Sequence, residues 1–522
     1  MSRTPSETIA DARNDYDEKK LPEDRNATDL ENGRDSATAL NTENDGAEPE
    51  DAVRRKTETE EDPYCVALDE TDSPKHLSQA RKWLIVLIIS SSALCVTCAS
   101  SIASFSETGL AQDFHVSREV TILSISLFVE GLGIGPLLVG PLSEVYGRNV
   151  VYRVSYFLFF VFTWPIVFAP DIVVFLVFRF ITGFCGSAFL SVAGGSIGDL
   201  FDNHSVANPM AVYTMSPFIG PVLGPLISGF INQNTNWRWT YRTLIIWIFV
   251  QTIALYILVP ETYEPVLVKR KAAKMRKSSG DENYYAPLER DSPSVWKAIE
   301  ISCYKPFQLL LYDRMALLLD TWNALILGIL YLAFQAYPFI FEDNHGFTPQ
   351  FTGLTFLGIG IGMFTALATQ PYWNRLHARR AAQYGEHPPP EIRLIMGQVG
   401  GVLAPISLIW MAFTTYSHVH WIAPIIASVP FGASIYYIFT STFTYLVTAY
   451  RPIAASAMAS NSFLRSAFAA VFPLFATPMY ETLGTVGATA LLAGLTALMA
   501  PLPFIFYRIG GRLREKSPFA AS

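Results

Sequence analysis

Four ionisable residues lie within long apolar stretches of the sequence, where charged side chains are rare. Glu130 and Asp320 are acids, and Arg179 and Arg465 are bases. An ionisable residue inside a membrane span costs about 2.5–3.5 kcal/mol on insertion scales, so it normally faces a cavity or a partner. A carboxyl group removed from water can exchange protons near neutral pH. The four residues therefore indicate proton coupling, with packing ion pairs as the alternative for the two arginines and Asp320.

The elements that carry these residues are predicted to be membrane helices. The chain has 522 residues, of which 51% are hydrophobic and 16% charged, too few charges to cover a soluble globule of this size. Apolar runs of about twenty residues match a hydrocarbon core of about 30 Å. We expect an all-α membrane protein with twelve spans, at about 83–104, 119–140, 150–169, 172–194, 207–231, 241–259, 316–339, 352–369, 394–414, 421–446, 455–475 and 484–506.

The chain is expected to divide into five parts. Residues 1–82 are acidic and polar, which predicts a disordered cytoplasmic tail without a cleaved signal peptide. Two six-helix bundles follow, at 83–259 and 316–506, separated by a polar cytoplasmic linker at 260–315 and followed by a tail at 507–522. Two halves with equal numbers of spans suggest an internal repeat, which many transporters use to build a central site.

The distribution of Lys and Arg predicts that both termini face the cytoplasm. On that topology the sequons at Asn26 and Asn203 carry no glycan. The acids crowd into the first eighty or so residues, so the net charge of -7 does not indicate a nucleic-acid partner, and none is expected.

Cys95 and Cys98 lie in an apolar run and are expected to pack in the core. His418 and His420, a pair in an outer loop, supply too few ligands for a metal site, and no metal site is expected. The glycine-rich segments GLGIG at 131–135 and GIGIG at 358–362 are interpreted as helix-packing sequences rather than dinucleotide-binding loops.

The segment GPLSEVYGRNV, which begins at Gly140, is expected to form a charged loop after the second span. Its glycines allow a tight turn, and its opposed charges can pair in one conformation and separate in another. The segment resembles the signature between the second and third spans of the major facilitator superfamily. Gly140, Glu144, Gly147 and Arg148 match that signature, while Asn149 stands where a second basic residue is usual.

The fifth span contains SPFIGPVLGPLISGF, which is similar to the antiporter motif of the same superfamily. Small residues let helices approach closely, and proline bends a helix; close packing alone is the alternative interpretation. The residues that match the motif are Gly220, Pro221, Gly224 and Gly229, and those that depart from it are Ser216, Pro225 and Ser228.

Other segments resemble the fungal twelve-span drug:proton antiporters within that superfamily. RFITGFCGS, which begins at Arg179, is similar to a fourth-span motif in which the arginine is thought to assist proton transfer; Thr182 replaces the usual glutamine. NWRWTYR at Asn236, PETYEPVLVKRKA at Pro260 and the run from Ser456 extend the likeness over about residues 84–517. The family often has an apolar residue where Glu130 stands, and aspartate is common in place of Thr448.

The resemblance implies a major facilitator fold whose two bundles rock about a central cavity. It implies a proton-coupled efflux pump that exports amphipathic small molecules, such as drugs or a fungal secondary metabolite, by alternating access. The alternative functions are a polyamine exporter, a proton-coupled importer and a nutrient receptor. The sequence contains no visible catalytic cluster, so an enzyme is not expected. We expect a monomer in the lipid bilayer of the plasma membrane, or of the vacuole, powered by the proton gradient without a cofactor.

Aromatic residues make up 13% of the chain, which fits a cavity that binds ring-bearing substrates. Interfacial anchoring and packing explain most other rings equally well. The candidate cavity residues are Trp322, Phe334, Tyr337, Tyr436 and Tyr437.

Overall fold

Long apolar helices dominate the described part of the chain, which in this computed structural model comprises residues 64–69, 72–202, 205–291, 295–384 and 388–520. Most of the predicted acidic tail and both sequons, Asn26 and Asn203, lie outside it. Eleven helical stretches in the described part are long and apolar enough to cross a membrane. The first six contain α2 (Gln79–Ser101), α4 (Arg118–Tyr146), α5 (Arg148–Val167), α6 to α8 (Ile172–Gly186, Ala188–Ser191 and Ala193–Leu200), α9 (Ala207–Asn234) and α10 (Arg238–Leu258).

The other five stretches form the second half. They contain α14 (Arg314–Tyr337), α15 and α16 (Pro349–Thr355 and Leu357–Ala368), α18 (Leu394–Thr414), α19 (Ile422–Ala449), and α20 with α21 (Ala454–Met499 and Leu502–Arg514). The last stretch is 61 residues long, and Gly484 within it has φ +69°, so two spans meet there at a kink. The prediction of an all-α protein with twelve spans is confirmed.

Each half has its own apolar core. The first core draws its buried residues from the range 85–259, and the second is centred on the range 309–506. Six residues of the first half belong to the second core and so mark where the halves meet: Ala103, Ile125, Val129, Met215, Phe218 and Val222. The contact between halves is therefore apolar.

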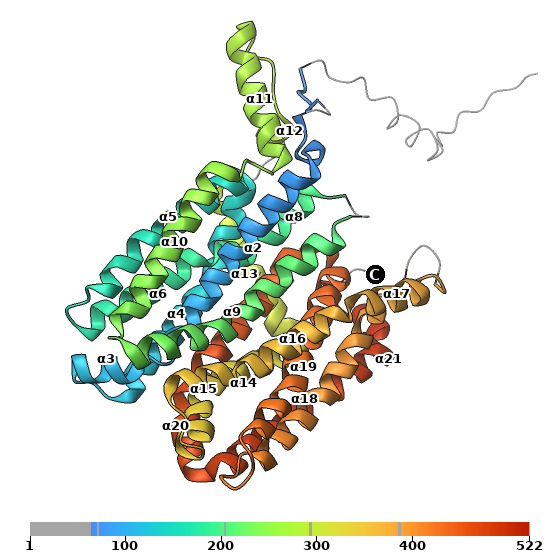
Figure 1. The fold of residues 1–522 in the computed structure, drawn as a ribbon. Helices are drawn as coiled ribbons and strands as arrows, with labels where there is room; N and C mark the ends of the chain where they lie inside the picture. The colour runs from blue at the N-terminus through green and yellow to red at the C-terminus, as the bar shows by residue number, and fades with distance from the viewer. Residues whose placement is uncertain (1–63, 70–71, 203–204, 292–294, 385–387, 521–522) are drawn as a thin grey trace, which may run out of the picture. The chain divides into compact units, whose positions relative to one another are not determined.

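Close helix crossings bring the halves together along two seams. In one seam α4 packs on α20, and a methyl group added at Gly133 would lie 2.5 Å from Ser466 Cβ. In the other seam α9 packs on α15, and a methyl group at Gly353 would lie 2.7 Å from the Pro225 carbonyl oxygen. Small residues are needed at both crossings because the backbones nearly touch. Figure 1 shows α3 (Glu107–Phe114) and α11 (Glu264–Ser279) at opposite ends of the bundle, which we call the α3 end and the α11 end.

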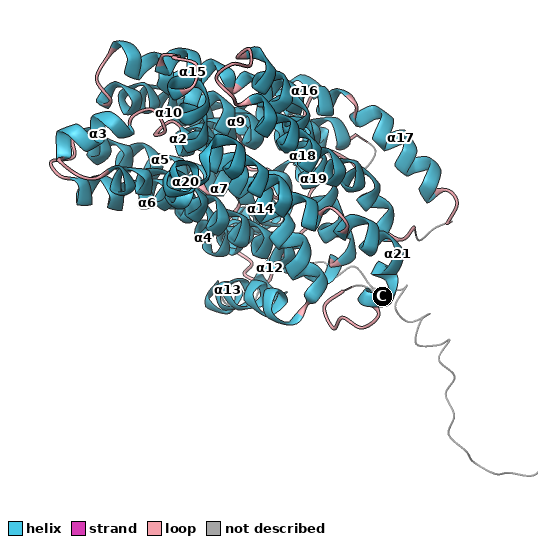
Figure 2. Ribbon diagram, turned by 90° about the horizontal axis from the view of Figure 1, so that it is seen from below, coloured by secondary structure: helices cyan, strands magenta, loops and turns pink. Residues whose placement is uncertain are grey.

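The segment between the halves is helical in three places. α11 is followed by α12 (Pro287–Asp291) and α13 (Val295–Tyr312), and α13 packs on α4 and α20, with the rings of Phe307 and Phe463 4.9 Å apart. Figure 2, seen along another direction, shows α13 beside α4 and α12. The linker thus crosses the seam between the halves.

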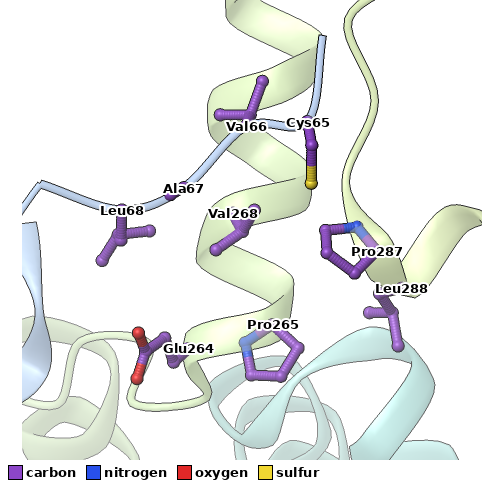
Figure 3. A pocket seen from close by; sticks show the side chains of 9 residues that line it. All are labelled: Cys65, Val66, Ala67, Leu68, Glu264, Pro265, Val268, Pro287 and Leu288. Carbon is purple, nitrogen blue, oxygen red and sulfur yellow. The ribbon is translucent and has the colours of Figure 1, made fainter. Parts of the chain in front are cut away.

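Residues 64–69 are fastened to the linker. The Val66 amide donates to the Tyr285 carbonyl oxygen at 3.0 Å, and Lys271 Nζ lies 2.7 Å from Asp69 Oδ2. Figure 3 shows a small pocket between residues 65–68 and α11, with Val66 and Val268 among the residues that line it. This pocket lies outside the helix bundle, so it does not form the substrate path.

All five cysteines lie in the described part, and all are free. Cys95 and Cys98 are fully buried in α2, which confirms the prediction that they pack in the core. The CVTC sequence is therefore explained by packing.

Candidate coupling and gating sites

The charged segment after the second span is mostly helical, so the prediction of a loop there is wrong. α4 continues to Tyr146, and the chain turns only at Gly147, whose φ of +99° favours glycine. A side chain at Gly147 would also collide with the Glu261 carboxylate. The helix extends beyond the expected end at residue 140 because prolines are tolerated in membrane helices whose neighbours satisfy the freed backbone groups. The turn therefore occurs at one residue.

Arg148 is the centre of a polar cluster at the α11 end. Its Nη1 donates to Ser143 Oγ at 2.6 Å, and its Nε lies 3.5 Å from Asp199 Oδ2. Its backbone amide donates to Glu261 Oε1 at 2.9 Å, and its guanidinium lies 4.6 Å from the centre of the Tyr263 ring. We call Arg148, Asp199 and Glu261 the hinge cluster. It ties together the ends of three spans of the first half.

Glu261 is the acceptor that organises the turn. Its Oε1 also accepts from the amides of Thr262 and Tyr263, each at 3.1 Å, and its Oε2 lies 3.6 Å from Arg270 Nη2. Sequence reasoning did not assign a role to Asp199 or Glu261. Both are acids shortly after a predicted span, at 172–194 and 241–259, and that position was the available signal.

Two of the residues predicted for the gate lie outside the hinge cluster. Glu144 is exposed, and within the described part of the chain it forms no ion pair. Gly140 has open space where a methyl group would be added. The structure thus brings together Gly147 and Arg148 but leaves Glu144 and Gly140 apart from them.

Arg179 is fully buried in α6 and binds backbone carbonyl groups. Its Nε donates to the Ser124 oxygen at 2.8 Å, and its two terminal nitrogens donate to Ala99 at 3.0 Å and Ser100 at 3.4 Å. Its guanidinium also lies 4.3 Å from the centre of the Phe128 ring. These contacts hold α2, α4 and α6 together. Arg179 forms no ion pair with any described carboxylate.

Arg465 is a residue of α20, and Asp320 of α14 contacts the same helix. Asp320, fully buried in α14, accepts from Ser460 Oγ and Asn461 Nδ2, each at 2.9 Å. Arg465, about one turn further along α20, forms no ion pair among the described residues, and its Nε is buried without a hydrogen-bond partner there. Asp320 of α14 thus bonds to α20 about one turn from Arg465, but the carboxylate and the guanidinium form no ion pair within 4.0 Å.

Glu130 lies on α4 between Ser126 and Gly133, two residues that contact α20. It is half-buried, and no ion pair joins it to Arg465 or to another described residue. Asp320 and Arg465 thus lie at α20, and Glu130 is on α4, which packs against α20, whereas Arg179 is bonded within the first half.

The fifth-span motif lines two helix crossings. A methyl group at Gly220 or Gly224 would collide with α2, and one at Gly229 would lie 2.5 Å from the Pro349 carbonyl oxygen of α15. Pro221 is buried within α9. The motif helix thus packs against its own half at one level and against the other half further along.

The five predicted cavity rings pack within the core of the second half, at separate places. Trp322 faces α18 near Gly401, and Phe334 and Tyr337 both contact the Phe356 ring, at 5.6 and 4.3 Å. The hydroxyl groups of the other two rings, Tyr436 and Tyr437, form hydrogen bonds with residues 369 and 370. Tyr436 donates to Gln370 Oε1 at 3.1 Å, and the Tyr437 hydroxyl is 2.9 Å from Thr369 Oγ1.

A different set of rings lies where the halves meet. Phe218 of α9 and Phe439 of α19 are 5.0 Å apart across the interface. The Arg465 guanidinium lies 5.5 Å from the Phe439 ring and 5.3 Å from the Phe443 ring. We call Phe218, Phe439, Phe443 and Arg465 the interface cluster. The spacing of Phe439 and Phe443, four residues apart on one helix face, was the sequence signal for it.

Polar contacts between the halves occur on the α3 side of the hinge cluster. The described residues form four hydrogen bonds between the halves: Ser100 with Tyr331, Glu107 with Gln335, Arg118 with Gln335, and Ser126 with Ala470. The contacts of the hinge cluster, by contrast, stay within the first half and the start of the linker. The halves are thus fastened to each other toward one end.

Two solved structures share the overall fold of the chain. The xylose transporter XylE from E. coli matches with a TM-score of 0.57 and 15% identity, over 82% of this chain and 98% of that chain. A peptide transporter, POT, matches with a TM-score of 0.61 and 14% identity, over 86% of this chain and 99% of that chain. The chain therefore shares the fold of these two structures.

The sequence comparisons give the family. The profile described as Major Facilitator Superfamily matches residues 89–473, and the chain belongs to this superfamily. It is 44% identical to "Efflux pump atB" of Aspergillus terreus, over 90% of this chain and 92% of the relative. It is 42% identical to "Probable drug/proton antiporter YHK8" of Saccharomyces cerevisiae, over 87% and 88%. The chain is therefore a secondary transporter rather than an enzyme.

Proposed function

We propose that the protein is a proton-coupled efflux pump that exports amphipathic small molecules by alternating access. The observation that carries this proposal is the high identity, across nearly the whole chain, to relatives named as an efflux pump and as a drug/proton antiporter. A multidrug transporter of Aspergillus fumigatus, mdrA, is 38% identical over 89% of this chain and 77% of the relative. Drugs or a fungal secondary metabolite are the proposed substrates.

The geometry supports a cycle in which the halves rock. We assign the α3 end to the outside and the α11 end, with both termini, to the cytoplasm, on the distribution of Lys and Arg. The hydrogen bonds between the halves then close the outer side, and substrate enters from the cytoplasm. The hinge cluster breaks and remakes its contacts as the halves move, and Glu144 is proposed to pair in the opposite conformation.

The interface cluster is the proposed substrate site. Phe218, Phe439 and Phe443 offer ring faces to an apolar substrate, and Arg465 offers a donor for a polar group. The five rings predicted from sequence pack at separate places in the core of the second half and are not part of this proposed site. A site made from both halves changes shape when they rock, which alternating access requires.

Proton coupling is assigned to the carboxyl groups in the spans. Asp320 and Glu130 are the proposed proton acceptors, Arg465 modulates Asp320 from the next turn of α20, and Arg179 positions α2, α4 and α6. A membrane potential of about 100 mV adds roughly 2.3 kcal/mol per charge moved fully across, enough to drive a modest substrate gradient.

Replacement of Glu130 by glutamine tests its part in this function. Cells that express the wild-type pump are expected to accumulate less fluorescent drug than cells without it, and Glu130→Gln is expected to raise accumulation several-fold towards the level without the pump. The measurement is cellular fluorescence at equal surface expression. Glu119→Gln, an exposed acid at the start of the same helix, is the control. Equal accumulation with wild type and Glu130→Gln would remove Glu130 from the mechanism.

The plasma membrane is the proposed location, with the vacuolar membrane as the alternative, and the pump is proposed to act as a monomer. A polyamine exporter would use the same framework with a different substrate. A proton-coupled importer would share the fold but carry substrate in the direction in which protons flow.

A further inference from the structure

One face of α14 and of the π-helical turn that follows it, η3 (Pro338–Asp343), contacts the first half at the α3 end. Tyr331, Gln335 and Phe339 are spaced by four residues and so lie along a single helix face. The hydroxyl groups of Tyr331 and Ser100 are 2.6 Å apart. The guanidinium of Arg118 lies 5.9 Å from the centre of the Phe339 ring. This face is therefore the part of the second half that meets the outer ends of α2 and α4.

Gln335, in the middle of this face, bonds to an acid and a base of the first half. Its Nε2 donates to Glu107 Oε1 at 2.6 Å, and its Oε1 accepts from Arg118 Nη2 at 3.2 Å. Arg118 Nε lies 4.0 Å from Glu107 Oε2. We call Glu107, Arg118 and Gln335 the outer latch. Opening the α3 end requires that both bonds of Gln335 break.

The Glu107 carboxyl group is shut off from water in the closed latch. Its side chain is 5% exposed, whereas that of Arg118 is 45% exposed and so largely solvated. Burial raises the pKa of Glu107 to about 8, although Arg118 and Gln335 act to lower it. The charge of a half-exposed arginine at 4.0 Å is screened, so it compensates only part of the cost of burying a carboxylate.

Within the described residues, two further ionisable side chains face the latch. Tyr241 of α10 faces Glu107 with a neutral hydroxyl, and Glu342 of η3 faces Arg118. Asp113, on the same helix as Glu107, is bonded to Trp237 and Arg238 instead. The protonation of Glu107 is therefore governed by its burial against Gln335 and by Arg118.

We propose that Glu107 is an external proton-binding site and that binding of a proton there closes the outer latch. This inference rests on the proposed function and adds to it the step at which the outside proton acts. In the closed latch the carboxyl group is buried, whereas in an open latch it is hydrated and returns towards the ordinary glutamate pKa of about 4.3. The closed form thus binds more protons, so closing is favoured as the external pH falls.

The expected pH range follows from the pKa of Glu107 in the closed latch, about 8, and the ordinary glutamate pKa of about 4.3. Between about pH 5 and pH 8 the ratio of open to closed latch should rise by up to about tenfold per pH unit, because one proton is released on opening. In an exporter this coupling has a direct use. After substrate leaves to the outside, an external proton closes the latch and commits the pump to return inward.

The test follows the latch without any substrate. Spin labels at Gln112 of α3 and at Ser417, between α18 and α19, are both on exposed positions of opposite halves. The labelled pump, with its five native cysteines replaced, is placed in lipid nanodiscs. The distribution of distances between the two labels is then measured by double electron–electron resonance from pH 5 to pH 8.5. We expect the short-distance population to dominate at pH 5 and to decline as the pH rises.

Two variants make the test specific. Glu107→Gln keeps a neutral group that can bond to Gln335, so its distance distribution should not depend on pH. Glu119→Gln, an exposed acid near Arg118, should follow the wild type. A wild-type distribution that does not change with pH would overturn the proposal even if Glu107→Gln failed to fold, and so would an unchanged pH response in folded Glu107→Gln. Failure of efflux with a normal pH response would instead count against the proposed function.

Discussion

Asp320→Asn is expected to abolish proton-driven accumulation of substrate while leaving exchange of substrate across the membrane intact. Asp320 is fully buried and bonds to Ser460 and Asn461 of α20. An ionised carboxylate in this position lacks a cation within 4.0 Å among the described residues, so loss of its proton must be accompanied by local rearrangement. Asparagine has nearly the same shape but cannot release a proton. It should therefore separate movement of the halves from proton coupling.

The measurement compares two modes of transport in reconstituted vesicles. Accumulation driven by a pH gradient should fall at least tenfold in Asp320→Asn, whereas counterflow of labelled against unlabelled substrate, without a gradient, should stay within about twofold of the wild type. Asp343→Asn, an exposed acid of η3, is the matched control and should behave as the wild type. Undiminished gradient-driven accumulation in Asp320→Asn would exclude Asp320 as a coupling residue.

Arg148→Ala is expected to reduce all modes of transport more than tenfold. The side chain joins Ser143, Asp199 and the Tyr263 ring at the α11 end. Its loss leaves the partly buried Asp199 carboxylate without this cation and frees the ends of three spans. The backbone bond from residue 148 to Glu261 remains, so the turn at Gly147 should still form. Counterflow should therefore fall together with gradient-driven transport, in contrast to Asp320→Asn.

A double-mutant cycle isolates the contribution of this ion pair. Arg148→Ala, Asp199→Asn and the double variant are compared by thermal unfolding in detergent and by counterflow. We expect the two substitutions to be non-additive in unfolding free energy by about 0.5–3 kcal/mol. Arg380→Ala, on an exposed part of α17 (Gln370–Ala381), is the control. Additive effects of the two substitutions would show that the pair does not act as a unit.

The spans could be predicted from sequence because each depends on local composition. Twenty apolar residues identify a membrane helix wherever they occur, and the twelve spans followed from that pattern. Helix ends were less predictable. The glycines and opposed charges of the segment that begins at Gly140 suggested a loop there, yet the helix runs to Tyr146 and ends where Gly147 takes a positive φ.

The partners of the functional residues could not be predicted, because they come from distant parts of the chain. Arg148 was identified by its motif, but its partners Asp199 and Glu261 follow other spans. Glu107 appeared in no motif, and its burial results from contact with Gln335, more than two hundred residues away. A resemblance to a family supplies motif positions, whereas long-range contacts require the fold.

Export in exchange for protons fixes the direction in which substrate moves under an imposed pH gradient. Inside-out plasma-membrane vesicles from cells that express the pump expose its cytoplasmic face, and their lumen is acidified to impose the gradient. We expect a fluorescent amphipathic substrate to accumulate in the acidic lumen, this accumulation to collapse with a protonophore, and the luminal pH to rise as substrate enters. Movement of substrate out of the acidic lumen together with protons, or accumulation that is indifferent to the gradient, would contradict it.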